Sequence, residues 1–163
     1  MREEAFSPDP PRKRNSCKAV VFDRDTVLLT RNSDRRGDFY LLPGGGQRMG
    51  ETLHAAVRRE TAEETGWLVD PGRLLLVRDY IGAHHEFAGE DGDVHQVELM
   101  FAAGLLERVE GWMPVRDAWQ TGVDWLPLAR LEEVRIYPSV LCGLLPLLAS
   151  GDYGGPVYLG DVN

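Results

Sequence analysis

Three glutamates, Glu60, Glu63 and Glu64, are the residues of this sequence whose spacing most clearly suggests chemistry. A helix over residues 52–65, at 100° per residue, places the three carboxylates within an arc of about 100°. Carboxylates this close repel one another. A divalent cation removes the repulsion, because Mg²⁺ prefers carboxylate oxygens and keeps water and substrate phosphates as its other ligands. The cluster therefore indicates either a metal site or a solvated acidic helix face, the usual interpretation of a charge run.

The expected helix has clear ends and one basic residue among its acids. Thr52 is a suitable N-cap, and Gly66 is suited to the left-handed position after the last turn. Arg59 precedes Glu63 by four residues, so its guanidinium can orient one carboxylate without neutralising the whole cluster. Leu53 lies on the same stripe one to two turns earlier. The acidic face is therefore expected at the edge of the core.

The order of fixed residues around these glutamates resembles the signature of the Nudix hydrolases, of the kind called MutT-like. The seven matching residues are Gly45, Glu51, Arg59, Glu60, Glu63, Glu64 and Gly66. At ordinary residue frequencies, chance agreement is on the order of one in 10⁸ per starting position. Two positions depart from the family pattern, which usually has Ile, Leu or Val where this sequence has Thr61 and Trp67.

The resemblance implies roles for individual residues of the helix and of the glycine segment before it. Glu60, Glu63 and Glu64, with the carbonyl of Gly45, would bind Mg²⁺ or Mn²⁺, and Arg59 would hold the glutamates in place. The expected substrate-binding residues are Gly44, Gly45, Arg48 and Glu51.

The general base is less clear, because members of this family take it from different places. Glu98 is the favoured candidate, with Glu86 and Glu90 as alternatives, while an exposed strand residue is the plain interpretation of Glu98. The loop over residues 82–93 also contains His84 and His85. These histidines indicate either a second metal site or a solvated loop that faces the substrate.

The elements that must position these residues alternate between strands and helices. We expect an α/β fold, a Nudix-type α/β/α sandwich with a mixed β-sheet. The domain is expected over residues 16–150, after a flexible N-terminal arm (1–15) and before a C-terminal tail (151–163). The expected strands are 16–22, 26–30, 39–42, 74–81, 94–106 and 123–126, with helices at 52–65, 128–134 and 139–149. Residues 31–38 are expected to form a polar loop, and Pro71-Gly72 a turn.

Composition limits the function classes. The 163 residues are 43% hydrophobic and 27% charged, with a formal net charge of −8. That charge argues against a protein that holds nucleic acid by its own positive field. Two cysteines, Cys17 and Cys142, are too few for a disulfide framework, and no apolar stretch is long enough to cross a bilayer. We expect a cytoplasmic protein without membrane contact, and a homodimer in which residues 141–149 supply core or interface.

The expected function is a Mg²⁺-dependent pyrophosphohydrolase that cleaves the diphosphate of a small nucleotide by water attack on phosphorus. The linked group is open, because residues 82–85 lack the proline or tyrosine that marks two subfamilies, so a nucleotide sugar, ADP-ribose or a nucleoside triphosphate all fit. A non-catalytic Nudix-like nucleotide sensor is the alternative. An mRNA-decapping enzyme fits the −8 charge less well.

Overall fold

The structure is a computed structural model that describes residues 13–114 and 119–163. Most of the predicted N-terminal arm lies outside the described residues. Its last three residues belong to the first strand, β1 (Lys13–Val20), because their backbone continues the parallel pairing with β7 (His95–Arg108).

The first sheet carries the strands on which the candidate site is built. Its order is β10-β6-β7-β1-β5, with β5 at Gly44–Gly46, β6 at Trp67–Ile81 and β10 at Tyr158–Asp161. The β6–β7 and β1–β5 pairs are antiparallel, and the β1–β7 and β10–β6 pairs are parallel. The sheet is therefore mixed, as the sequence predicted.

A second sheet has the order β2-β3-β4-β9, with β8 paired to the free side of β3. Its strands are β2 (Phe22–Asp23), β3 (Thr26–Asp34), β4 (Gly37–Leu41), β8 (Gln120–Pro127) and β9 (Ile136–Tyr137).

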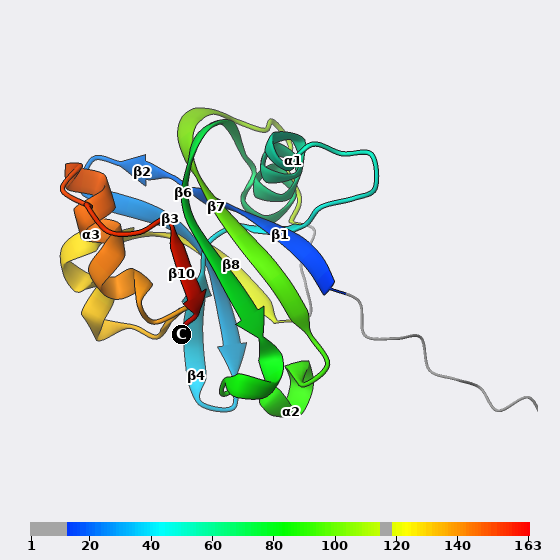
Figure 1. The fold of residues 1–163 in the computed structure, drawn as a ribbon. Helices are drawn as coiled ribbons and strands as arrows, with labels where there is room; N and C mark the ends of the chain where they lie inside the picture. Colours follow the sequence, from blue (N-terminus) through cyan, green and yellow to red (C-terminus); the bar gives the residue numbers. More distant parts are fainter. Residues whose placement is uncertain (1–12, 115–118) are drawn as a thin grey trace, which may run out of the picture.

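Helices are few and short. The longer two are α1 (Leu53–Thr65) and α3 (Leu141–Ser150), which Figure 1 shows on opposite sides of the central strands. The remaining helical segments are η1 (Gly82–His84), α2 (Ala88–Asp91) and η2 (Leu128–Glu133). The predicted helix at 128–134 is thus a 3₁₀ helix. No helix in the described part of the chain is long and apolar enough to cross a membrane.

The core divides into two clusters because successive strand residues face opposite sides. Cys17 and Ala19 of β1 pack with Val57 of α1, whereas Val20 packs in the cluster that contains Leu145 of α3. This places α3 in the core, which was one of its two predicted roles.

Three expectations about local structure were wrong, each because strand pairing overrides the local sequence pattern. The polar segment 31–38 is mostly strand, since β3 extends to Asp34 and pairs with β4 on one side and β8 on the other. Pro71-Gly72 is a register shift inside β6, and proline is tolerated at such bulges. The predicted C-terminal tail adds β10 beside β6 (Figure 1).

Candidate active site

Helix α1 begins and ends where the sequence predicts. The Thr52 hydroxyl accepts a hydrogen bond from Ala55 N at 3.2 Å. Gly66 adopts φ +73°, and its N–H donates to Ala62 O. A side chain at Gly66 would also collide with the Trp112 ring, since a Cβ there would lie 2.6 Å from Trp112 Cδ2. The rotation of α1, and so the direction of its glutamates, is fixed by these caps and by the buried Val57.

Arg59 joins three carboxylates into one cluster. Its Nε and Nη2 donate to the two carboxylate oxygens of Glu51, at 2.8 and 2.9 Å. Its Nη1 lies 2.6 Å from Glu60 Oε1 and 3.4 Å from Glu63 Oε2, and its Nη2 donates to Gly46 O at 3.0 Å. The hydrogen bonds from Arg59 lower the pKa of Glu51 to about 2. Glu51 is therefore a fixed anion that anchors Arg59.

The glycine segment lies against the same carboxylates. Gly44 N–H donates to Glu64 Oε2 at 2.8 Å. A Cβ on Gly45 would lie 2.7 Å from the Glu60 carboxyl carbon, and one on Gly44 only 2.0 Å from Cys17 O. Both glycines are needed because carboxylate and backbone occupy the space that a side chain would take.

The donor set suits a hard divalent cation, although in this structure Arg59 takes part of it. Three carboxylates and the backbone of β5 supply the oxygen atoms that Mg²⁺ and Mn²⁺ prefer. The Glu60 carboxyl group lies directly against Gly45, so the backbone of β5 and a helix carboxylate are close enough to serve one cation. Within the described residues, no three His, Cys, Asp or Glu side chains already converge as a metal-ligand group.

A cavity of about 610 Å³ lies next to this cluster. Lys18 and Glu98 line the end that is connected to the cluster, because Lys18 Nζ donates to Gly44 O at 2.9 Å. An aromatic group, Phe39, Phe87 and Tyr137, lines another part, with ring centroids 5.1–5.7 Å apart. The volume suits a small organic ligand such as a nucleoside with part of its linked group.

The sequence model of the family described as NUDIX domain matches residues 12–141 of this chain. The chain belongs to the NUDIX family. The family prediction made from the signature spacing is thereby confirmed.

Individual relatives of this NUDIX domain differ in their named substrates. It is 40% identical over 73 residues to the 8-oxo-dGDP phosphatase NUDT18 of Mus musculus, covering 41% of this chain and 22% of that protein. It is 28% identical over 107 residues to diphosphoinositol polyphosphate phosphohydrolase 3-alpha of Mus musculus, covering 66% and 59%. The chain thus spans less than two thirds of either relative.

A solved structure supports the fold. A NUDIX hydrolase from Nitrosomonas europaea superimposes with a TM-score of 0.68 at 18% identity, covering 86% of this chain and 91% of that one. The predicted fold class is confirmed by this likeness.

The structure of this NUDIX domain brings most of the predicted site residues together. Glu51, Arg59, Glu60 and Glu63 form the Arg59 cluster, and Glu64 reaches Gly44. Arg48 lies at the rim: its side chain is 66% exposed and 3.7 Å from Glu63 Oε1.

Glu98 lies in the cavity wall rather than on an exposed strand. It is 6% exposed, so the plain interpretation from the sequence was wrong. Its Oε2 accepts from Arg78 Nε at 2.6 Å and its Oε1 from Gln96 Nε2 at 3.0 Å. Burial raises the pKa of Glu98, but the positive charges of Arg78 and Lys18 outweigh it, so the pKa lies below its usual range.

The histidine-containing loop is tied to the last strand. His84 Nδ1 and His85 Nε2 each lie 2.6 Å from a carboxylate oxygen of Asp161 in β10. Burial raises the pKa of Asp161, but the hydrogen bonds from both histidines outweigh this effect and lower the pKa to about 2. Glu86 contacts Asn163. The loop is therefore fastened by the C-terminal segment, and its histidines do not converge as a metal site in the described residues.

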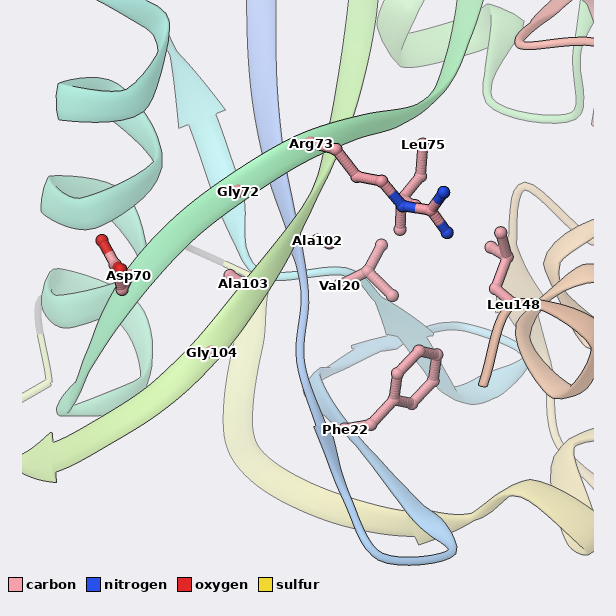
Figure 2. A pocket seen from close by; sticks show the side chains of 10 residues that line it. All are labelled: Val20, Phe22, Asp70, Gly72, Arg73, Leu75, Ala102, Ala103, Gly104 and Leu148. Atoms are coloured by element: carbon pink, nitrogen blue, oxygen red, sulfur yellow. The ribbon is translucent and has the colours of Figure 1, made fainter. Parts of the chain in front are cut away.

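A second, smaller hollow of about 320 Å³ lies between β6, β7 and α3, and Figure 2 shows the side chains that line it. Val20, Phe22, Leu75 and Leu148 point into it, and none of the helix glutamates lines it. It is a largely apolar hollow that Asp70 and Arg73 also line, and it is not part of the candidate site.

Sequence reasoning missed Lys18, Arg78 and Asp161. Lys18 is the one basic residue of the predicted strand 16–22 and Arg78 that of the predicted strand 74–81, and alternation alone does not reveal what they face. A charged residue inside an otherwise apolar strand is the signal that could have singled them out.

Proposed function

We propose that this NUDIX domain is a Mg²⁺- or Mn²⁺-dependent pyrophosphohydrolase. Its substrate would be a nucleoside diphosphate linked to another group, such as a nucleotide sugar, ADP-ribose or a nucleoside triphosphate. One observation carries the proposal: the Arg59 cluster of carboxylates lies against Gly44–Gly46, next to a cavity of about 610 Å³.

The cation would be held by Glu60, Glu63 and Glu64 with the carbonyl of Gly45. When bound, a divalent cation neutralises phosphate charge and makes a bound water more acidic. Arg59 keeps the glutamates oriented, and Glu51 keeps Arg59 oriented through its two hydrogen bonds. This arrangement explains why the signature needs an acid eight positions before Arg59.

The cavity would hold the organic part of the substrate. The rings of Phe87 and Tyr137 are half-buried, which leaves ring surface for stacking on a base. Glu98 fits a positioning role better than the role of general base, because Arg78 and Gln96 already bond both of its oxygens. Glu86 and Glu90 also line the cavity and are the remaining candidates for the base.

The test is hydrolysis of a nucleotide panel with and without Mg²⁺, with products identified by mass. The panel spans ADP-ribose, nucleotide sugars, dinucleoside polyphosphates and nucleoside triphosphates. We expect metal-dependent cleavage that is lost in the Glu63→Gln/Glu64→Gln double variant. Glu107→Gln, an exposed acid on β7, is the matched control. Nucleotide binding without turnover would overturn the hydrolase in favour of a sensor.

Two further proposals concern the oligomeric state and the location of the protein. We propose that it is a homodimer and that it acts on a small nucleotide in the cytoplasm. Light scattering of the purified chain measures the oligomeric state, and a monomer at micromolar concentration would contradict the homodimer.

A further inference from the structure

Lys18 occupies the junction between the carboxylate cluster and the cavity. Its neighbours Cys17 and Ala19 pack in the cluster beneath α1, so the alternation of β1 turns Lys18 to the other face, where it lines the cavity. There Lys18 Nζ donates to Gly44 O, and the N–H of the same glycine donates to Glu64 Oε2. One glycine therefore separates the Lys18 ammonium from a helix glutamate.

The other cations that line the cavity in the described residues have different surroundings. Arg78 is 4% exposed and is paired with Glu98, and it also donates to Val162 O. Arg35 and Arg36 lie where β3 turns into β4, and Arg36 contacts Tyr137 in the aromatic group. Lys18 is thus the cavity cation placed at the cluster end.

An ammonium group has three N–H donors, so Lys18 can hold Gly44 O and a ligand oxygen at the same time. A diphosphate bound beside several carboxylates needs positive charge close to it, because like charges at a few ångströms repel strongly in a partly buried site. Lys18 supplies such a charge from the cavity side.

We propose that the Lys18 ammonium binds a phosphate oxygen of the substrate's diphosphate, where the chain passes from the carboxylate cluster into the cavity. This assignment rests on the proposed function, since it uses the same site. It makes Lys18 a substrate-binding residue that lies outside the signature. A purely structural Lys18, which only balances the charge of Glu98, is the competing explanation.

The binding test uses inorganic pyrophosphate as the probe, with Mg²⁺ present, and calorimetry as the readout. We expect Lys18→Met to weaken pyrophosphate binding about tenfold or more, because a hydrogen bond to a charged group is lost. Lys18→Arg, which keeps the charge, should recover most of the affinity. Lys13→Met is the matched control, since Lys13 lies on the same strand and its side chain is exposed beside Asp79.

A second readout separates contact from structural support. Lys13 and Lys18 are the only lysines of the sequence, so ¹³C-lysine labelling gives two sets of lysine side-chain signals, which Lys18→Arg assigns, and it leaves all three N–H donors of each ammonium in place. Pyrophosphate should shift the Lys18 signal saturably and leave the Lys13 signal in place. An unmoved Lys18 signal, or unchanged affinity in Lys18→Met, overturns the assignment. A shift in a protein that cleaves no nucleotide would contradict the hydrolase and leave the Lys18 assignment standing.

Discussion

Arg59 donates two hydrogen bonds to the carboxylate of Glu51, from Nε to Oε1 at 2.8 Å and from Nη2 to Oε2 at 2.9 Å. Glu51 lies just before α1 and Arg59 in its middle, so the pair fastens the helix to the segment that follows the glycines. The bidentate geometry fixes the guanidinium plane, which then presents Nη1 to Glu60.

Replacing Arg59 tests this arrangement. Arg59→Lys retains the charge but cannot bond Glu51, Glu60 and Gly46 O together, since an ammonium lacks the planar fork. We expect kcat/KM for the best substrate of the panel to fall about 100-fold, as a misplacement near 1 Å produces. Arg58→Lys, whose arginine pairs only with exposed Asp70 in the described residues, should change little. Equal effects of the two substitutions would contradict a specific role for Arg59.

Glu98→Gln distinguishes a positioning residue from a general base. Loss of its charge leaves Arg78 buried without a counterion, which should lower the free energy of unfolding by about 3 kcal/mol. We expect the acidic limb of the pH–rate profile to remain, because a different group takes the proton. Urea unfolding and the pH–rate profile of the same variant measure the two effects. Loss of the acidic limb would show that Glu98 is the base.

Asp34 should make stability depend on pH. The hydrogen bonds from Arg135 lower the pKa of Asp34 to about 2, below its ordinary 3.8. A lowered folded-state pKa means that this stabilisation is complete above about pH 4 and is lost as the pH falls toward 2. We expect Asp34→Asn to flatten the fall of the unfolding free energy between pH 4.5 and 2.5 (about two units around the ordinary carboxyl value). Asp38→Asn, on the same hairpin, is the control, and an equal flattening there would contradict the assignment.

Replacing Thr61 should make the folded protein more stable. It is fully buried on α1, and among the described residues its hydroxyl is one of the buried polar groups without a hydrogen-bond partner. Thr61→Val removes that unsatisfied group at similar volume and should raise the free energy of unfolding by about 1 kcal/mol. Thr65→Val should have the opposite sign, because the Thr65 hydroxyl donates to Thr61 O at 2.6 Å. Chemical denaturation measures the free energy of unfolding of both variants. A lower value for Thr61→Val than for the unchanged protein would contradict the prediction.

Asp161 should control the order of the loop that follows β6. Asp161→Ala removes its contacts with His84, His85 and Ile81 N, so amide exchange over residues 82–91 should accelerate while α1 is unaffected. Hydrogen–deuterium exchange with mass spectrometry measures both regions at once. Asp152→Ala, an exposed residue after α3, is the control. Unchanged exchange in the loop would mean that other contacts hold it.

The elements that depend on local sequence pattern could be predicted from the sequence. The caps Thr52 and Gly66 and the apolar stripe of α1 are all written within fifteen residues, so the helix was predicted closely. The polar strand end at 31–34 and the strand β10 were not, because the partners β8 and β6, on which their pairing depends, are far away in sequence. Pairing on both sides of β3 outweighs the weak strand preference of its polar residues.

The site divides in the same way. The sequence by itself determined the family, through the fixed spacing of Glu51, Arg59, Glu60 and Glu64, because residues on one helix and its approach meet by helical geometry alone. Only the tertiary structure decided that Lys18 of β1 reaches Gly44 of β5. Such contacts depend on strand order and register, which local periodicity does not encode.

The contacts of the residues in and around the cavity wall depend most clearly on the tertiary structure. From the sequence, Glu98 is an ordinary polar residue of a strand that also carries His95 and Gln96, and only the pairing of β6 with β7 sets it against Arg78. Asp161 reads as part of a glycine-rich end, and only the parallel addition of β10 brings it to His84 and His85. The sequence therefore determines which acidic residues share the helix, whereas long-range strand pairing determines which residues line the cavity.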